Sequence, residues 1–443
     1  MQVLQIILAL SILVLIHELG HYTFARIFGI RIDKFFLFFD AAGIKLFSTK
    51  SKWFVKLCPK AAKWETEYGI GWLPLGGYCK VNGMIDESMD TDHLKNEPQP
   101  WEFRSKPAWQ RLLVMVGGVL FNFILGIMLF GFSLFKWGES YLPAENNPIY
   151  IYEGYKLAED MGFRTGDVIL ALDGEKPENF YMMQIDMARN MVSTVTVLRD
   201  TDTLDIYVDQ KYIADMLQTQ MFEPAVPFIV KDFLETSPNI EAGLIPGDKI
   251  TAIDSIPVKC VQSARPILAE KAGTKIMATV QRDTAFLTLP LTVDANGSIG
   301  VYLEDLTIKQ VSYSFLESIS GGFRKAYDAT VGQLKDMRLL AQPSTGAYKS
   351  VGSIIAITDA MPEQWNWPAF IHILAMISII LGVMNLLPIP ALDGGHIVFT
   401  LYEMITGRKP SDNFLYVMQI IGMILIFGLM FLAFGNDIAR LLN

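Results

Sequence analysis

The sequence has few groups that could cross-link the chain or bind nucleic acid. Its three cysteines, Cys58, Cys79 and Cys260, lie far apart and form neither a CxxC pair nor a disulfide framework. Lysine and arginine number 37 against 46 for aspartate and glutamate, which gives a net charge of −9 and a pI near 5.2. This balance argues against nucleic acid as a partner.

Charged residues are also scarce, at 19% of the chain, and the mean hydropathy of +0.31 is high for a soluble protein. No lysine or arginine occurs before Arg26, and no small-residue cleavage site follows the apolar run at residues 3–16. A cleaved signal peptide needs a basic segment before its apolar run and a cleavage site after it. We therefore expect the first run to stay in the protein as a membrane helix.

Four apolar runs each approach the roughly 20 residues that cross a bilayer. They predict transmembrane helices within residues 1–30, 111–136, 370–393 and 414–436. Lysine and arginine gather between the first two runs and again at Arg408 and Lys409. Basic loops favour the cytoplasmic side, so both termini and the long segment before the third run are expected outside the cytoplasm.

The first run contains the pattern HExxH, written here as His17-Glu18-Leu19-Gly20-His21. On a helix, residues i and i+4 share a face, so both imidazoles could reach one zinc ion while Glu18 takes a proton from water. The pattern arises by chance in many proteins, but ionisable groups within a membrane segment are functional candidates. The alternative is a polar cluster hydrogen-bonded between helices.

A third zinc ligand is expected in "NLLPIPALDGGHI", residues 385–397. Catalytic zinc normally has three protein ligands and one open position. Pro388 and Pro390 cannot both continue a regular helix, so the third run should unwind there. Asp393 follows the prolines and is the preferred ligand, and His396 is the competing one.

These stretches, together with "GWLPLGGYCKVNGM" at residues 71–84, resemble the site-2 protease family of intramembrane zinc metalloproteases. The branch that resembles the chain most is the regulator-of-sigma-E protease branch, with tandem PDZ domains. The resemblance implies one zinc ion bound by His17, His21 and Asp393, with Glu18 as general base. It also implies that Asn385, Pro388 and Pro390 shape the substrate site.

The glycine pair Gly76-Gly77 suits a tight turn or a close approach of the backbone. An ordinary cytoplasmic hairpin would explain it. The resemblance implies instead a membrane-reentrant β-element within residues 31–110, whose edge strand could pair with an unwound substrate.

An internal repeat lies in the segment before the third run. "GFRTGDVILALDGE" begins at Gly162 and "GLIPGDKITAIDSI" at Gly243, an offset of 81 residues. The repeat resembles the core of PDZ domains, which we place at 138–222 and 223–308. They could capture peptides by strand addition or act as a steric filter; we favour the filter. An amphipathic helix and a connecting loop are expected at 309–369.

The expected fold is therefore a multi-pass α-helical membrane protein with a membrane-reentrant β-element and two inserted extracytoplasmic PDZ domains, which are mainly β. The expected function is zinc-dependent hydrolysis of peptide bonds within transmembrane segments. Family resemblance suggests single-pass substrates in the bacterial inner membrane, either trimmed anti-sigma factors or signal-peptide remnants. The alternatives are a catalytically inactive PDZ scaffold and a transporter with a broken third helix.

Overall fold

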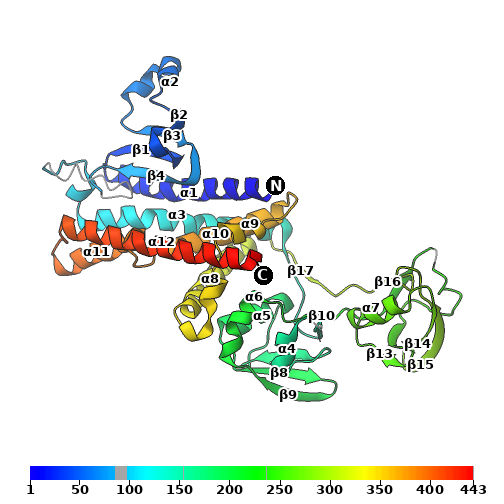
Figure 1. Cartoon of the computed structure of the whole chain (residues 1–443). Coiled ribbons are helices and arrows are strands. Elements are labelled where there is room, and N and C mark those ends of the chain that lie inside the picture. Colours follow the sequence, from blue (N-terminus) through cyan, green and yellow to red (C-terminus); the bar gives the residue numbers. More distant parts are fainter. Residues whose placement is uncertain (85–96, 153, 236, 443) are drawn as a thin grey trace. The chain divides into compact units, whose positions relative to one another are not determined.

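The computed structural model describes residues 1–84, 97–152, 154–235 and 237–442 (Figure 1). The chain forms two compact units. The first unit consists of Met1–Gly138, Ser312–Met337 and Val351–Asn443, and the second of Glu139–Val311 and Arg338–Ser350.

Four described helices of the first unit are long and apolar enough to cross a membrane, judged by length and composition. They are α1 (Gln2–Ile27), α3 (Ala108–Trp137), α10 (Trp367–Asn385) and α12 (Asp412–Leu442). The expected multi-pass helical membrane protein is confirmed at this level. α3 is the shared support, because it packs against α1, α10 and α11 (Asp393–Thr406).

Close contact between α1 and α3 depends on facing glycines. A Cβ added at Gly117 would lie 2.7 Å from the carbonyl oxygen of Gly20, and one at Gly20 would clash with the backbone of Gly117 in return. The two helix backbones therefore approach closely just where α1 carries its histidines. Small residues at helix crossings allow such an approach.

The third apolar run is interrupted after Asn385. α10 ends there, residues 386–392 are not helical, and α11 begins at Asp393. Pro388 and Pro390 lie in this interruption, and Ala391 has a left-handed φ of 82°. The backbone of α12 passes directly over the turn, since a side chain at Gly422 would overlap the carbonyl of Pro390.

A partly buried ion pair joins α11 to α3. Arg111 donates a hydrogen bond from Nη2 to Glu403, and its Nε donates to the carbonyl oxygen of Lys106 at 3.0 Å. Arg111 is 7% exposed. Removing one partner of such a pair would leave an uncompensated buried charge, so the pair fixes where α11 lies against α3.

A four-stranded sheet follows α1. Its strands are β1 (Ile32–Phe39), β2 (Lys45–Ser48), β3 (Glu67–Gly71) and β4 (Leu73–Val81), in the order β2-β3-β1-β4. β1 and β3 are parallel, and the other pairs are antiparallel. Among the described strands β4 is an edge strand, and it packs against α1. The connection from β2 to β3 contains α2 (Lys52–Leu57) and a 3-10 turn, η2 (Pro59–Lys63).

The expected amphipathic helix corresponds to α8 (Phe315–Leu340). The glycine pair Gly321-Gly322 does not break it, because α8 is one continuous helix. A Cβ at Gly322 would lie 2.7 Å from the carbonyl oxygen of Ile127, so this glycine allows α8 to approach α3. α9 (Ile354–Asp359) follows, and its N-cap Ser353 donates from its backbone N–H to Asp437 at 2.7 Å.

The described part of the second unit contains two large hydrophobic cores, the first centred on residues 142–222 and the second on 228–303. A small third cluster consists of Tyr150, Ala225 and Cys260. The elements around the first core are β5 (Glu139–Tyr141), β6 (Ile149–Tyr150), α4 (Lys156–Asp160), β7 (Val168–Leu172), α5 (Met183–Arg189), β8 (Thr194–Arg199), β9 (Asp202–Tyr207), α6 (Ile213–Gln218) and β10 (Glu223–Pro224). Those around the second are β11 (Val230–Phe233), β12 (Lys249–Ile253), β13 (Ile256–Pro257), α7 (Val261–Glu270), β14 (Lys275–Arg282), β15 (Ala285–Thr292) and β16 (Val301–Leu303). A short strand, β17 (Lys309–Val311), returns to pair with β5.

The sequence repeat builds the same local structure twice. In the first copy, Arg199 donates to both carboxylate oxygens of Asp167 at 2.8 Å and to the carbonyl of Gly162 at 2.8 Å. In the second, Arg282 donates to both oxygens of Asp248 at 2.7 and 2.8 Å and to the carbonyl of Gly243 at 2.8 Å. Each aspartate is 1% exposed or less. The equivalence supports a tandem duplication, and its assignment as PDZ domains stays a prediction.

Loss of one arginine should destabilise only its own repeat. Burial raises the pKa of Asp248, but the hydrogen bonds from Arg282 and from the Ile245 N–H outweigh it, so the pKa lies below its ordinary value. A lowered pKa stabilises the fold above the unfolded-state value near 3.9, and that contribution is lost as pH falls through the folded pKa.

We therefore expect Arg282→Gln to destabilise β12 and β14 at neutral pH, and to destabilise them less below about pH 4. Arg199→Gln is the matched control and should affect β7 and β8 instead. Amide hydrogen exchange of both variants measures the effect. Equal loss of protection in both repeats would contradict it.

Candidate active site

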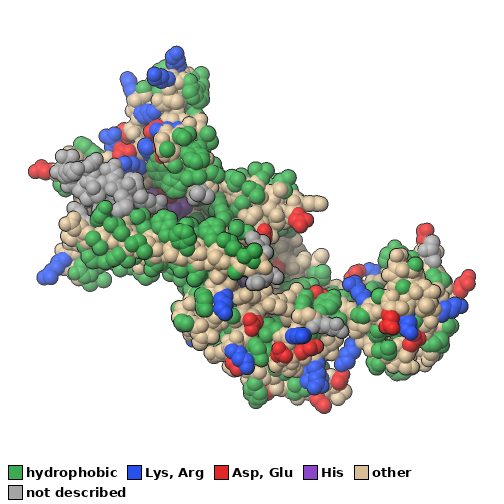
Figure 2. Space-filling view, in the orientation of Figure 1, with side chains coloured by type: hydrophobic (Ala, Val, Ile, Leu, Met, Phe, Trp, Pro, Cys, Tyr) green, Lys and Arg blue, Asp and Glu red, His purple; other side chains and the backbone are tan. Residues whose placement is uncertain are grey.

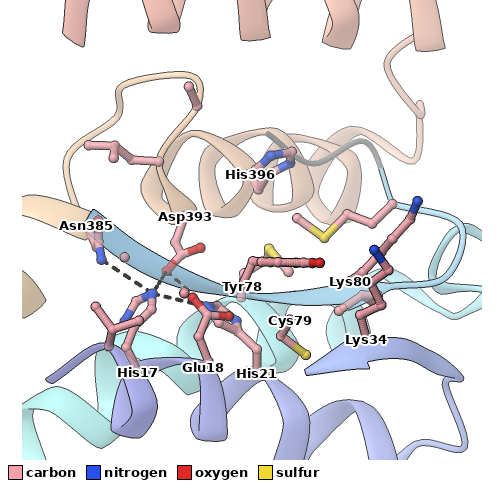
Figure 3. Close-up of a pocket in the computed structure, with 18 of the residues that line it drawn as sticks. His17, Glu18, His21, Lys34, Tyr78, Cys79, Lys80, Asn385, Asp393 and His396 are labelled. Atoms are coloured by element: carbon pink, nitrogen blue, oxygen red, sulfur yellow. Dashed lines mark hydrogen bonds and ion pairs between the residues drawn. The ribbon is translucent and has the colours of Figure 1, made fainter. Parts of the chain in front are cut away.

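Three side chains from two helices converge on one point (Figure 3). His17 and His21 lie one turn apart on α1, and their Nε2 atoms are 3.2 Å from each other. Asp393, the first residue of α11, places Oδ2 3.3 Å from each of those nitrogens. Among the histidine, cysteine and acidic side chains of the described residues, these three lie close enough together to hold a metal ion.

The spacing of these atoms fits zinc. Ligand atoms bound at about 2.0–2.1 Å in a tetrahedron lie about 3.3–3.4 Å apart, close to the separations found here. Oδ2 of Asp393 is buried and has no hydrogen-bond partner. Because unpartnered electron pairs that face one another in a buried place are unfavourable, a cation is the natural occupant of this group.

Backbone and side-chain groups of α3 orient both imidazoles. Nδ1 of His21 lies 2.9 Å from the carbonyl oxygen of Val114. A carbonyl only accepts, so the ring proton is on Nδ1 and the lone pair of Nε2 points at Asp393. Such a contact fixes the tautomer that a metal requires.

The side-chain amide of Asn122 orients His17 as the carbonyl of Val114 orients His21. Nδ1 of His17 lies 3.0 Å from Nδ2 of Asn122, while Oδ1 of that amide is buried without a partner. Turning the amide by 180° exchanges these two atoms and gives Nδ1–H of His17 an acceptor. This orientation satisfies Oδ1 and leaves the Nε2 lone pair of His17 for a metal.

Glu18 lies in the same cavity, between the two histidines in sequence. The backbone N–H of Cys79, on edge strand β4, is hydrogen-bonded to its carboxylate. The cavity has a volume of about 590 Å³ and is bounded by α1, β4, the end of α10 and the start of α11. It can therefore hold several residues of an extended peptide beside Glu18.

The predicted substrate residues divide into two groups. Asn385, Gly76 and Gly77 line the cavity, and Nδ2 of Asn385 is 3.4 Å from Nε2 of His17. Pro388 and Pro390 are not among the lining residues. They end α10 and form the turn that brings Asp393 to the histidines, so their contribution to the cavity is indirect.

His396 lies three residues after Asp393 on α11 and also lines the cavity. Figure 3 shows its ring on the far side of Asp393 from His17 and His21. It is not part of the three-residue group that could hold a metal. The geometry favours Asp393 over His396 as the third ligand.

Several cavity residues were missed in the sequence. Gln419 reaches the cavity from α12. Its amide within an apolar run was the feature of the sequence that could have pointed to it. Tyr78 donates to Asp40 at 2.8 Å, and Lys34 pairs with the same carboxylate at 3.1 Å. Burial raises the pKa of Asp40, but these two hydrogen bonds outweigh it and hold the pKa below its ordinary value. No sequence pattern marked this group.

Comparison with known proteins identifies the family. The family model for peptidase family M50 matches residues 5–429. The chain belongs to peptidase family M50. These are the site-2 proteases, which are zinc metallopeptidases, so the recognition, the enzyme class and the zinc cofactor expected from the sequence are confirmed.

The M50 chain also resembles named relatives over nearly its full length. One from Neisseria meningitidis, provisionally named a zinc metalloprotease, is 27% identical over 99% of both chains. The regulator of sigma-E protease RseP of Salmonella typhimurium is 26% identical over 98% of both chains. A relative from Borreliella burgdorferi, also provisionally named a zinc metalloprotease, is 27% identical over 100% of this chain and 99% of its own.

A side chain at Gly118 should impair metal binding by this M50 peptidase. Its Cβ would lie 2.7 Å from Cε1 of His17 and closer still to Nε2 of His21. Gly118→Ala should therefore displace both rings and lower zinc affinity by about 10–100-fold, as loss of ligand support does elsewhere.

The matched control is Gly428→Ala, because a Cβ there meets nothing within 4 Å. Zinc content of the two purified proteins, followed during titration with a chelator, gives the answer. Full zinc retention in folded Gly118→Ala protein would show that the rings do not hold the metal in this arrangement.

Proposed function

We propose that this M50 peptidase hydrolyses peptide bonds within transmembrane segments of other membrane proteins. The supporting observation is that a zinc-compatible group and a carboxylate share one cavity with an edge strand, within a unit that has four potential spanning helices. A peptide bond buried in a bilayer can be hydrolysed only if metal and water reach its depth.

His17, His21 and Asp393 would hold one zinc ion, and Glu18 is the general base. Bound zinc supplies a Lewis acid that polarises the scissile carbonyl and its attacking water. Glu18 accepts the proton of that water and passes it to the leaving amine. The Cys79 N–H holds the Glu18 carboxylate in the cavity, and the amide of Asn385 is placed to donate to the carbonyl oxygen of the substrate.

β4 presents the substrate. A helix hides its backbone carbonyls, so the substrate must be extended where it is cut, and an extended peptide can add to a free sheet edge. β4 pairs with β1 on one side only among the described strands. Gly76 and Gly77 line the cavity there and let a second backbone come close. This sheet is the membrane-reentrant β-element.

The substrates are single-pass proteins of the bacterial inner membrane, either trimmed anti-sigma factors or signal-peptide remnants. One relative is named a regulator of sigma-E protease, which supports the first class. In this arrangement the basic loops face the cytoplasm, and the second unit and both termini lie outside it. An inactive scaffold would need no complete set of ligands and base, and the M50 membership argues for the enzyme.

Glu18→Gln should give folded, zinc-loaded but inactive protein. Glutamine keeps the size and polarity of the side chain but cannot accept the proton, so the rate should fall at least about 100-fold. Cleavage of a membrane substrate by purified variant, normalised to zinc content, measures this. Turnover near the wild-type rate would overturn the role of Glu18.

Asp393→Ala and His396→Ala separate the two candidates for the third ligand. Asp393→Ala should lose most of its zinc and all activity, because only His17 and His21 remain. His396→Ala should keep its metal. Metal analysis of both purified proteins decides the matter, and the reverse result would move the ligand to His396.

The two repeats of the second unit are PDZ domains that exclude substrates with bulky outer domains. Their insertion between two spans that contribute to the same cavity supports this role. A variant lacking residues 138–308 should cut both trimmed and untrimmed forms of one substrate, whereas the full chain cuts only the trimmed form. If the zinc-loaded deletion protein fails on the trimmed form, the repeats capture substrate instead.

A further inference from the structure

The connection between β2 and β3 carries an unusual concentration of charge of one sign. Residues 44–64, here called the basic corner, contain six lysines and no acidic residue, in a chain whose net charge is −9. The hydrolytic site uses none of them. β2 is the outermost strand of the sheet, so the basic corner lies at the end of the sheet away from α1 (Figure 1).

Two of the six lysines have structural contacts. Lys45 pairs with Glu67 at 2.6 Å. Lys50 donates to the carbonyls of Ala61 and Ala62 at 3.2 Å and of Trp64 at 2.5 Å, so it closes the loop that holds η2. The basic corner is therefore a folded element with a defined outer surface.

The other four lysines form that outer surface. Lys52, Lys56, Lys60 and Lys63 are exposed, and none has a carboxylate partner in the part of the chain that the structure describes. Four unpaired ammonium groups within twelve residues repel one another. They would gain from an anionic partner.

Large apolar side chains lie among these lysines. Trp53 is 58% exposed, Leu57 75% and Leu46 68%, and Trp64 and Ile44 are also exposed. Figure 2 shows hydrophobic side chains along one side of this lobe, the side toward the N-terminal end of α1, and Lys and Arg side chains at its tip and on the other side. Tryptophan beside lysine is typical of surfaces that enter the boundary between lipid headgroups and acyl chains.

We propose that the basic corner docks on a bilayer that contains anionic phospholipids. The apolar side chains would enter the interface, and Lys52, Lys56, Lys60 and Lys63 would contact the headgroup phosphates. β1 and β4 pack against α1, one of the potential spanning helices, so the sheet is held beside the bilayer that α1 crosses. Lipid is therefore the nearest partner with complementary charge and an apolar layer.

Docking would fix both ends of the sheet. β4 is attached to α1 at the cavity, and the basic corner would attach the opposite edge to the membrane surface. The edge on which substrate is proposed to add would then hold a constant direction relative to the bilayer. Anionic lipid content would thereby influence how well the sheet presents a substrate.

Hydrogen exchange of the full-length protein in nanodiscs tests the proposal. Discs of phosphatidylcholine alone are compared with discs that also contain phosphatidylglycerol. Amides of residues 52–64 should exchange at least about fivefold more slowly in the anionic discs, since each lysine near an anionic surface is attracted appreciably. High salt should remove the difference.

A variant with Lys52, Lys56, Lys60 and Lys63 all changed to Gln should show no difference between the two lipids. Lys50 is kept because it closes the loop. The matched control changes three exposed lysines of the second unit, Lys156, Lys249 and Lys275, to Gln, and should retain the lipid effect. Unchanged exchange in α1 and α3 confirms that each variant is folded.

Equal exchange of residues 52–64 in both lipids would overturn the proposal. So would protection that appears only when an acidic peptide is added, because the occupant would then be a protein. A second variant, Trp53→Ser with Leu57→Ser, tests the apolar contribution separately. It should weaken protection in the anionic discs while keeping the salt dependence.

Discussion

The structure depends on directing three electron-pair donors at one point. The lone pairs of His17, His21 and Asp393 converge within 3.2–3.3 Å of one another. Without a cation, this arrangement of lone pairs is unfavourable in a buried place. With a cation bound, the three side chains must still be kept in the orientation that the metal requires. Each donor therefore needs a second group that fixes its direction, and those groups come from elsewhere in the first unit.

α3 provides most of this support. Val114 fixes the tautomer of His21, and the amide of Asn122 is placed to do the same for His17. Gly118 leaves room for both rings. The same helix anchors α11 through Arg111 and Glu403, and α11 carries Asp393. α3 therefore orients His17 and His21 directly and positions Asp393 through α11. This support requires the close packing of α3 against α1.

The sequence predicted the parts of the site that depend on local geometry. HExxH places two imidazoles on one face because the helix period is fixed, and two prolines end a helix because each lacks an N–H. Contacts between helices could not be predicted this way. Which face of α3 meets α1, and which face of α12 reaches the cavity, depends on packing, so Gln419 was not identified. Pro388 and Pro390 do not line the cavity, and their expected part in shaping the substrate site stays a prediction.

In the proposed mechanism, the position of β4 couples substrate presentation to the general base. The Cys79 N–H is hydrogen-bonded to the Glu18 carboxylate, and Gly77 on the same strand packs so closely on α1 that a Cβ there would lie 2.8 Å from Val14. The strand cannot slide along α1 without disturbing both contacts. A one-residue slip would also turn every side chain of β4 to the opposite face. In the proposed mechanism, a peptide that adds to β4 would therefore enter in a register tied to Glu18, and the strand rather than side-chain recognition would place the scissile carbonyl.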